Sequence, residues 1–343
     1  MADSVQTVLG PVSRSDLGII LPHEHLFSDD RSWSTVDPSS PLRDHPITLE
    51  TLGRISRNPT GVTEENLHID DEDEIAEEAS RFRTAGGTTL VDQTCSPAIG
   101  ARPEALPRLA QRTGLKIVAG CGYYIDSTIP PHIRDAGVDE IALDLRRQVL
   151  DGLGGSGVRP GIIGEIGTGS PITPAEQKVL RACARVQQET GLGLAIHVHP
   201  WRREAMDAIR IVSDEGADLS RVSIDHLDNT LDLEYHLEIA ATGVFLGFMS
   251  FGTEYYWDEG HYYAPTDRER VQHIVELVRR GHLRQILISQ DIGYKSLLVR
   301  YGGWGYAHVL EHVVPMLLRW GLSQQDVDVI TRENPARLLC GEP

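Results

Sequence analysis

Short runs of β-branched residues alternate with amphipathic segments along almost the whole chain. This alternation limits the fold most strongly, because it is typical of a parallel sheet whose strands are joined by covering helices. Eight runs are predicted to be strands, which end near His25, Gln93, Tyr124, Glu165, His197, His226, Met249 and Asp291. Eight such units predict an α/β fold, a (β/α)8 TIM barrel.

The stretches between the strands have the apolar spacing that indicates helices packed on a sheet. They span residues 71–85, 104–113, 139–150, 174–190, 202–215, 233–242 and 265–280. Glycine follows several of them, as is typical where a helix ends, at Gly86, Gly114, Gly191, Gly243 and Gly281. Extra C-terminal helices are predicted at 306–320 and 323–339.

Two segments do not belong to a minimal barrel. Residues 5–17 alternate apolar and polar side chains around Gly10-Pro11, which predicts a small N-terminal β-hairpin. Residues 28–70 are polar and too long for an ordinary connection, so we expect either a loop over the active-site mouth or a flexible excursion. No linker divides the chain, and a single domain over residues 1–343 is expected.

Composition excludes several classes of partner. The 32 basic and 50 acidic residues give a net charge of −18, which would repel nucleic acid and anionic membrane surfaces. The four cysteines have no paired spacing and are expected to be reduced thiols. The N-terminus has no basic region followed by an apolar one, and no apolar run is long enough to span a membrane, so we expect a cytoplasmic protein.

The strongest chemical signal is His23-Glu24-His25 at the end of the first predicted strand. Residues two apart in a strand face the same side, so both imidazoles are expected at the barrel mouth. Alone, such a pair is as often ordinary packing or surface as a metal site. Its position at a strand end favours the metal interpretation.

Other metal-binding residue types also stand at strand ends, where the active sites of such barrels are built. They are Glu165, His197, His226 and Asp291. Either histidine alone could equally be a hydrogen-bonded core residue, Glu165 an acid paired with arginine, and Asp291 the cap of a turn. His199 is an alternative to His197, but Pro200 suggests that the strand ends there, and His197 is preferred. Together the set suits two divalent cations, with Zn²⁺ the favoured metal.

Several sequence runs resemble the phosphotriesterase-related branch of the amidohydrolase superfamily. They are LPHEH, GIIGEIGTGSPITPAEQKVLRA, IHVHP, SIDHLDNT, ISQDIGYK, RYGGWGYAH and RENPARLL. The resemblance implies a barrel with two metals, in which His23, His25 and Asp291 hold the buried metal. It also implies that His197 and His226 hold the more exposed metal, and that an anionic side chain bridges the two.

The bridging position departs from the better-known members, which carry a carboxylated lysine there. The matching residue is Gly164, and the only lysines are Lys116, Lys178 and Lys295. The chain is closer to the phosphotriesterase homology proteins, whose bridging glutamate maps to Glu165. This position is one residue further along the strand, so a local bulge is required to turn Glu165 toward the metals.

The predicted chemistry is hydrolysis of a small molecule by hydroxide generated on the two metals, with Asp291 moving the proton. Candidate substrate-binding residues are Tyr123, Tyr124, Trp257, Tyr294 and Lys295. Lys295 could instead pair with a surface acid, and the aromatic loop that contains Trp257 could instead form the contact of a homodimer.

The metal ligands do not distinguish the possible substrates. A carbonyl ester is expected, with lactone opening favoured, amide cleavage the alternative, and phosphotriester hydrolysis at most promiscuous. Met249-Ser250 stands where the lactonases and triesterases of the family carry Asp followed by Arg or His, which weakens both of those classes. A binding protein that has the barrel but no metal is the non-enzymatic alternative.

Overall fold

The computed structural model describes residues 3–257 and 262–342, and eight strands form its central parallel sheet. They are β3 (Ile20–Glu24), β6 (Thr89–Asp92), β7 (Lys116–Cys121), β8 (Ile162–Gly167), β9 (Gly193–His197), β10 (Val222–Asp225), β11 (Phe245–Phe248) and β14 (Ile286–Ile288). Neighbours in the sheet follow chain order, and β14 lies beside β3, where the His23 amide donates to Ser289 Oγ at 3.3 Å. The predicted (β/α)8 barrel is confirmed as a nearly closed barrel.

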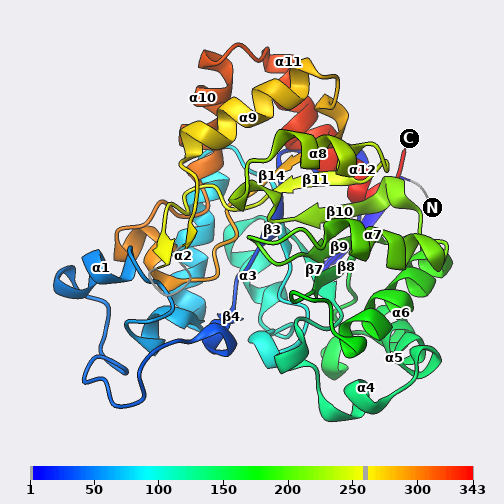
Figure 1. Ribbon diagram of the computed structural model, residues 1–343, viewed down its shortest axis with the longest axis horizontal. Coiled ribbons are helices and arrows are strands. Elements are labelled where there is room, and N and C mark those ends of the chain that lie inside the picture. Colours follow the sequence, from blue (N-terminus) through cyan, green and yellow to red (C-terminus); the bar gives the residue numbers. More distant parts are fainter. Residues whose placement is uncertain (1–2, 258–261, 343) are drawn as a thin grey trace.

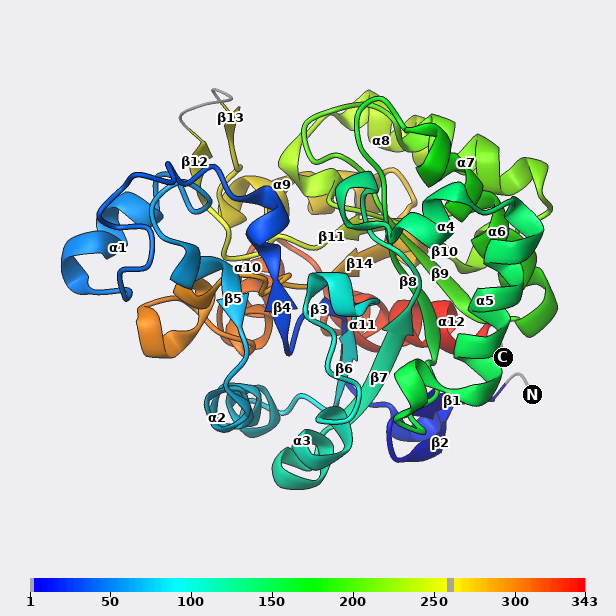
Figure 2. The same cartoon turned by 90° about the horizontal axis from the view of Figure 1, so that it is seen from below.

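Helices surround the barrel (Figures 1 and 2). The helices between strands are α2 (Glu72–Thr84), α3 (Leu106–Thr113), α4 (Pro131–Asp135), α5 (Val138–Asp151), α6 (Pro174–Thr190), α7 (Ala205–Asp214), α8 (Leu233–Ala240) and α9 (Asp267–Arg279). After β14 follow α10 (Val314–Arg319), α11 (Gln324–Asp328) and α12 (Asn334–Cys340), with π-helical turns before α10 and α12. None of the described helices is both long and apolar enough to cross a lipid bilayer.

The ends of α6 show how the local sequence sets a helix. The Thr173 hydroxyl accepts the Glu176 amide at 3.3 Å, and the Glu176 carboxylate accepts the Thr173 amide at 2.8 Å. This reciprocal pair is a capping box, and Pro174 fills the first helical position, where no amide hydrogen is needed. Gly191 ends the helix in the left-handed region, with φ of 69°.

Strand side chains form two apolar layers. Ile20, Val118 and Phe245 point into the barrel, where Val5 joins their cluster. Their neighbours along the strands point outward to the helices; these include Leu21, Leu90, Ile117, Leu194, Ile224, Leu246 and Ile286. The alternation follows from the pleat of a strand, and it aims the last inward residue of each strand at one rim.

An antiparallel hairpin precedes the barrel, as predicted, and is formed by β1 (Ser4–Thr7) and β2 (Gly10–Ser13). The Val8 amide donates to the carbonyl of Ile117 at 2.9 Å, at the start of β7. Since Ile117 lies in the amino-terminal half of its strand, the hairpin covers the end of the barrel that is remote from the strand ends.

The segment 28–70 is an ordered loop over the mouth. It contains β4 (Ser28–Asp29), α1 (Leu49–Ile55) and β5 (His68–Ile69), and it stands at the side of the molecule opposite both chain ends (Figures 1 and 2). The Ser296 amide donates to Asn66 Oδ1 at 2.9 Å, which ties the segment to the loop after β14. The first of the two predicted alternatives is therefore confirmed.

Candidate metal centre

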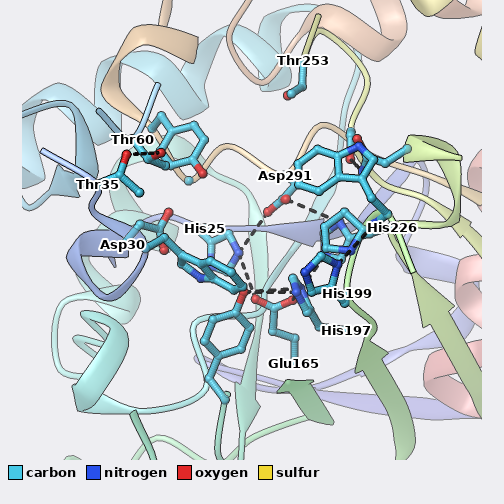
Figure 3. Close-up of a pocket in the computed structure, with 18 residues that line it drawn as sticks. His25, Asp30, Thr35, Thr60, Glu165, His197, His199, His226, Thr253 and Asp291 are labelled. Carbon is cyan, nitrogen blue, oxygen red and sulfur yellow. Dashed lines mark hydrogen bonds and ion pairs between the residues drawn. The ribbon is translucent and has the colours of Figure 1, made fainter. Parts of the chain in front are cut away.

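The structure brings the six predicted ligands together at one rim of the barrel. Figure 3 shows all of them except His23. They come from the ends of five strands: His23 and His25 from β3, Glu165 from β8, His197 from β9, His226 from β10 and Asp291 from β14. We call these six residues the ligand ring. All of its side chains are buried except that of Asp291, which is 27% exposed.

Glu165 lies at the centre of the ligand ring. One carboxylate oxygen, Oε2, is 3.1 Å from His197 Nδ1 and 3.4 Å from His226 Nε2. The other, Oε1, faces His25 Nε2 at 3.6 Å, and His23 Nε2 is 3.3 Å from Oε2. The carboxylate therefore lies between two pairs of imidazoles, which is the position that a bridging ligand requires.

A bulge in β8 gives Glu165 this direction. Ile163 pairs with Leu194 and Ile166 with Ile196, so β8 holds one more residue than β9 over this stretch. Ile163 and Ile166 both face the helices, and the extra residue turns Glu165 inward. The bulge required by the sequence is present.

Gly164 cannot carry the lysine of the better-known members in this arrangement. Its φ is +146°, and a Cβ on it would lie 2.8 Å from the Cβ of Ala195. Lys178 donates to backbone carbonyls, and Lys295 pairs with Glu65, so both are engaged outside the ligand ring.

Asp291 closes the other side of the ligand ring. Its Oδ1 is 3.1 Å from His25 Nε2 and 3.6 Å from His23 Nε2, and its Oδ2 is 3.6 Å from His226 Nδ1. The buried Glu24 holds the loop that carries Asp291, because its carboxylate accepts the Gln290 amide at 2.8 Å and the Ser289 hydroxyl at 2.7 Å. The loop after β14 is thus fixed to the end of β3.

The donor set fits divalent cations. Three groups of the six residues place one ligand atom each within 4.8 Å of the others: His23, His25 and Glu165; His23, His226 and Asp291; and Glu165, His197 and His226. His23 Nε2 is buried and has no hydrogen-bond partner among the described residues. A buried, unpaired imidazole nitrogen facing two carboxylates is the environment of a metal ligand.

Buried partners orient the first two histidines. Asp225 Oδ2 lies 2.9 Å from His23 Nδ1, and Thr94 Oγ1 lies 2.9 Å from His25 Nδ1. A proton shared at each Nδ1 leaves the lone pair of Nε2 pointing to the centre of the ring, as metal ligation requires. Sequence reasoning missed Asp225, although it stands next to His226 and faces inward.

The pKa values of the ligand ring reflect close pairing between its imidazoles and its carboxylates. Burial lowers the pKa of His25, but the facing Asp291 raises it more, to about 9, and the pKa values of His23 and His226 are raised as well. Burial raises the pKa of Glu165, but the facing imidazoles of His197 and His23 lower it more, to well below the usual range. The same balance, with His25 as the main partner, lowers the pKa of Asp291 to about 2. Burial lowers the pKa of His197. Two carboxylates are therefore ionised, and His197 is a neutral imidazole.

The ligand ring opens into a cavity of about 230 Å³. Its remaining lining residues, which we call the cavity wall, are Asp30, Trp33, Thr35, Thr60, Tyr124, His199, Pro200, Trp201, Asn229, Ser250, Thr253, Gly293 and Tyr294. The first four come from the segment 28–70. A loop over the mouth was one of the two expectations for this segment, but which of its residues line the cavity was not predicted, since the segment has no strand or helix pattern that fixes its path.

The predicted substrate-binding residues divide into two groups. Tyr124 and Tyr294 belong to the cavity wall, and the Tyr124 hydroxyl is 3.4 Å from the His197 ring. Tyr123 points elsewhere and donates to Asp144, while Lys295 is bound to Glu65 and does not line the cavity. Trp257 lies in β12 (Tyr256–Trp257), and its side chain lies outside the described part of the structure.

The two histidines at the end of β9 have different surroundings. His197 faces Glu165, whereas His199 lies further out in the cavity wall, where its Nδ1 accepts the Trp201 amide at 3.4 Å. His199 is in none of the three ligand groups. The geometry therefore suits His197, rather than His199, as a ligand.

Comparisons with known proteins agree with this fold. The sequence pattern of the phosphotriesterase family matches residues 3–339. The N-acetyltaurine hydrolase of Danio rerio is 39% identical over 343 residues, covering 98% of this chain and 97% of the relative. A resiniferatoxin-binding protein from Rhodobacter sphaeroides has a similar structure, with a TM-score of 0.95, 36% identity and coverage of 98% and 94% of the two chains.

A more distant structure, the lactonase Lmo2620 from Listeria monocytogenes, has a TM-score of 0.80 and 25% identity, covering 99% of this chain and all of that one. The barrel, its ring of imidazoles and carboxylates at the strand ends, and these similar proteins together identify a hydrolase. The chain belongs to the phosphotriesterase family. The resemblance seen in the sequence is confirmed.

Proposed function

We propose that this protein is an amide hydrolase with two divalent metal ions, and that it releases a small amine from its N-acyl derivative. The observation that carries the hydrolytic chemistry is the convergence of the ligand ring on Glu165, which faces two pairs of imidazoles. Amide cleavage is favoured because relatives 37–39% identical over nearly their whole length are N-acetyltaurine hydrolases. The sequence alone favoured a lactone first and an amide second.

In this proposal His23, His25 and Asp291 would hold the buried metal, His197 and His226 would hold the outer metal, and Glu165 would be a ligand shared by both. Two Zn²⁺ ions bound there would polarise the scissile carbonyl and make a shared water acidic enough to react at neutral pH. The carboxylate and imidazole donors are those that Zn²⁺ prefers.

Asp291 would transfer the proton. It is the only member of the ligand ring with a substantially exposed side chain, 27%, so it faces both the buried ring and the substrate cavity. Its carboxylate accepts a proton from the attacking water and donates it to the nitrogen of the leaving amine. The Tyr124 hydroxyl and the Trp33 ring stand beside His197 and limit the access of bulk water.

Metal analysis combined with an amide assay tests the proposal. Purified protein is expected to hold about two metal ions per chain and to release amine from N-acetyl compounds. Glu165→Gln is expected to lose at least one metal ion and most of the activity, whereas Asp29→Asn, a change at a half-buried position outside the cavity, should retain both. Full metal content and full activity in Glu165→Gln would contradict the bridging role.

Lactone opening is a second candidate, favoured by the Tyr124 phenol in the cavity wall and by the lactonase among similar structures. A set of lactones of different ring size, assayed beside the amides, separates the two. Faster turnover of a lactone than of every amide would make the lactone the physiological class.

A further inference from the structure

The cavity wall contains one carboxylate that the proposed reaction does not use. Asp30 begins a short 3₁₀ helix, Asp30–Trp33, in the segment 28–70. Side chains three residues apart lie on the same side of such a helix, so Asp30 and Trp33 both face the cavity. Figure 3 shows Asp30 on the side of His25, across from His199 and His226.

The Asp30 carboxylate is half-buried, and no hydrogen bond or ion pair joins it to another described side chain or to the backbone; His25 is the described group whose charge attracts it. Its Oδ2 lies against Gly293, where a Cβ would come within 2.5 Å of it. Burial raises the pKa of Asp30 to about 8. A half-buried carboxyl that faces a cavity and accepts no hydrogen bond from the protein is available to a ligand that supplies a donor.

Aromatic rings line the same cavity as this carboxylate. Trp33 and Tyr124 have ring centroids 6.5 Å apart, and both line the cavity together with Trp201 and Tyr294. The Asp30 carboxylate lies against Gly293, the residue before Tyr294 in the chain. An acid among aromatic faces is a common environment for the binding of an organic cation.

No lysine or arginine lines the cavity among the residues that the structure describes. Lys295, the nearest candidate in the sequence, is bound to Glu65. Apart from the metal ions proposed for the ligand ring, an acidic substrate group would therefore meet no compensating charge in the cavity wall, and the net charge of −18 favours cations over anions.

We infer that the amine part of the substrate carries a positive charge, and that Asp30 is its counter-ion. The inference rests on the proposed amide hydrolysis and names its substrate class: N-acylated amines with an ammonium or similar cation beyond the scissile bond. The aromatic rings of Trp33 and Tyr124 contact the same cation. The specificity of this chain thus differs from that of an enzyme for acidic amides such as N-acetyltaurine.

Three compounds of nearly equal length test the inference: N-acetylethylenediamine, N-acetylethanolamine and N-acetyltaurine. They end in an ammonium, a hydroxyl and a sulfonate, respectively. Wild-type protein is expected to give the highest kcat/KM with the ammonium compound, at least tenfold above the hydroxyl compound, with the sulfonate compound lowest. Affinities measured by calorimetry are expected to follow the same order.

Asp30→Asn is expected to lower kcat/KM and affinity for the ammonium compound about 30-fold, since removal of one partner of a buried charge pair is strongly unfavourable. The hydroxyl compound should change less than threefold. Asp29 is the neighbouring residue, and its carboxylate pairs with Arg31 outside the cavity. Asp29→Asn should leave kcat/KM and affinity unchanged for both compounds. Gly293→Ala displaces the Asp30 carboxylate without removing its charge. This change should lower the affinity and kcat/KM for the ammonium compound more than for the hydroxyl compound.

The outcomes are distinct. Hydrolysis of N-acetyltaurine as the best of the three, or an equal loss for all three in Asp30→Asn, overturns the inference and leaves the amide hydrolase standing. If none is hydrolysed, the proposed function fails for these amides, and the order of the measured affinities still decides the charge preference: ammonium first supports it, and sulfonate first overturns it.

Discussion

The ligand ring and the cavity wall are neighbours, but they are built differently. Each member of the ligand ring stands at or beside the end of a barrel strand, and buried groups such as Asp225, Thr94 and Glu24 orient it or its loop. The cavity wall comes mainly from loops, and its most distinctive acid, Asp30, forms no hydrogen bond or ion pair with the described residues. We therefore expect the strand ends to determine the chemistry and the loops to determine which substrate binds.

The largest effect is expected for a change in the ligand ring itself. Asp291→Asn keeps the shape of the side chain. It removes the charge that faces His23 and His25, and with it the proposed proton carrier. We expect kcat to fall by about 10³-fold or more, the range typical of a lost proton-transfer group. Steady-state kinetics measures the change in kcat, and thermal unfolding checks that the variant is folded. A rate within tenfold of wild type would remove the proton-transfer role.

A smaller effect is expected for a residue that contacts a member of the ligand ring but does not belong to it. Asp225→Asn leaves an amide beside His23 Nδ1, which can donate to that nitrogen and favour the tautomer that does not bind metal. Metal affinity should fall about 10- to 100-fold in competition with a chelator. Ser223→Ala, on the same strand and without a hydrogen-bond partner for its hydroxyl, is the matched control. Equal affinities in the two variants would contradict the orienting role.

Changes in the cavity wall should affect substrate binding without affecting metal content. Trp33→Ala removes a ring whose centroid is 6.4 Å from that of His197. We expect KM to rise about tenfold with two metal ions still bound, because the contact is made equally in the ground and transition states. Trp304→Ala, an exposed tryptophan outside the cavity, is the control. Loss of metal in Trp33→Ala would show that the wall and the ligand ring are not independent.

The smallest effect concerns the helices rather than the site. His236 on α8 and His273 on α9 are joined at 2.7 Å, and burial lowers their pKa values to about 3 and about 4. The unfolded chain takes up protons near pH 6.5, before the folded one does, so the free energy of unfolding should fall as the pH drops from 6.5 toward 4. Urea unfolding at several pH values measures this slope.

His273→Gln should make that slope shallower, because one of the two groups that resist protonation is gone. His132→Gln, at an exposed position, should leave the slope unchanged. A slope equal to that of wild type in His273→Gln would assign the acid sensitivity to the ligand ring instead.

Most of the ligand ring was predictable because strand geometry is local. The alternation of side chains, and the meeting of all strand ends at one rim, place His23, His25, His197, His226 and Asp291 from sequence alone. The direction of Glu165 was predictable only on condition of a bulge, whose presence depends on pairing with β9, a strand distant in sequence.

The cavity wall was predicted less completely. Tyr124 and Tyr294 were named, but Tyr123, adjacent to the first, bonds to Asp144 instead, and Lys295, adjacent to the second, bonds to Glu65. Which of two neighbouring side chains faces a cavity depends on the partners available to each. Those partners lie on other elements, and sequence spacing does not reveal them.

The amino-acid sequence by itself determined the barrel and the kinds of atoms at its rim, because the period of apolar residues and the residues at strand ends are local properties. Tertiary structure decided the shape and charge of the cavity. The segment 28–70 reaches it only through contacts such as that of Asn66 with Ser296, separated by 230 residues. The path of such a loop depends on the surface against which it packs, and only the folded barrel supplies that surface.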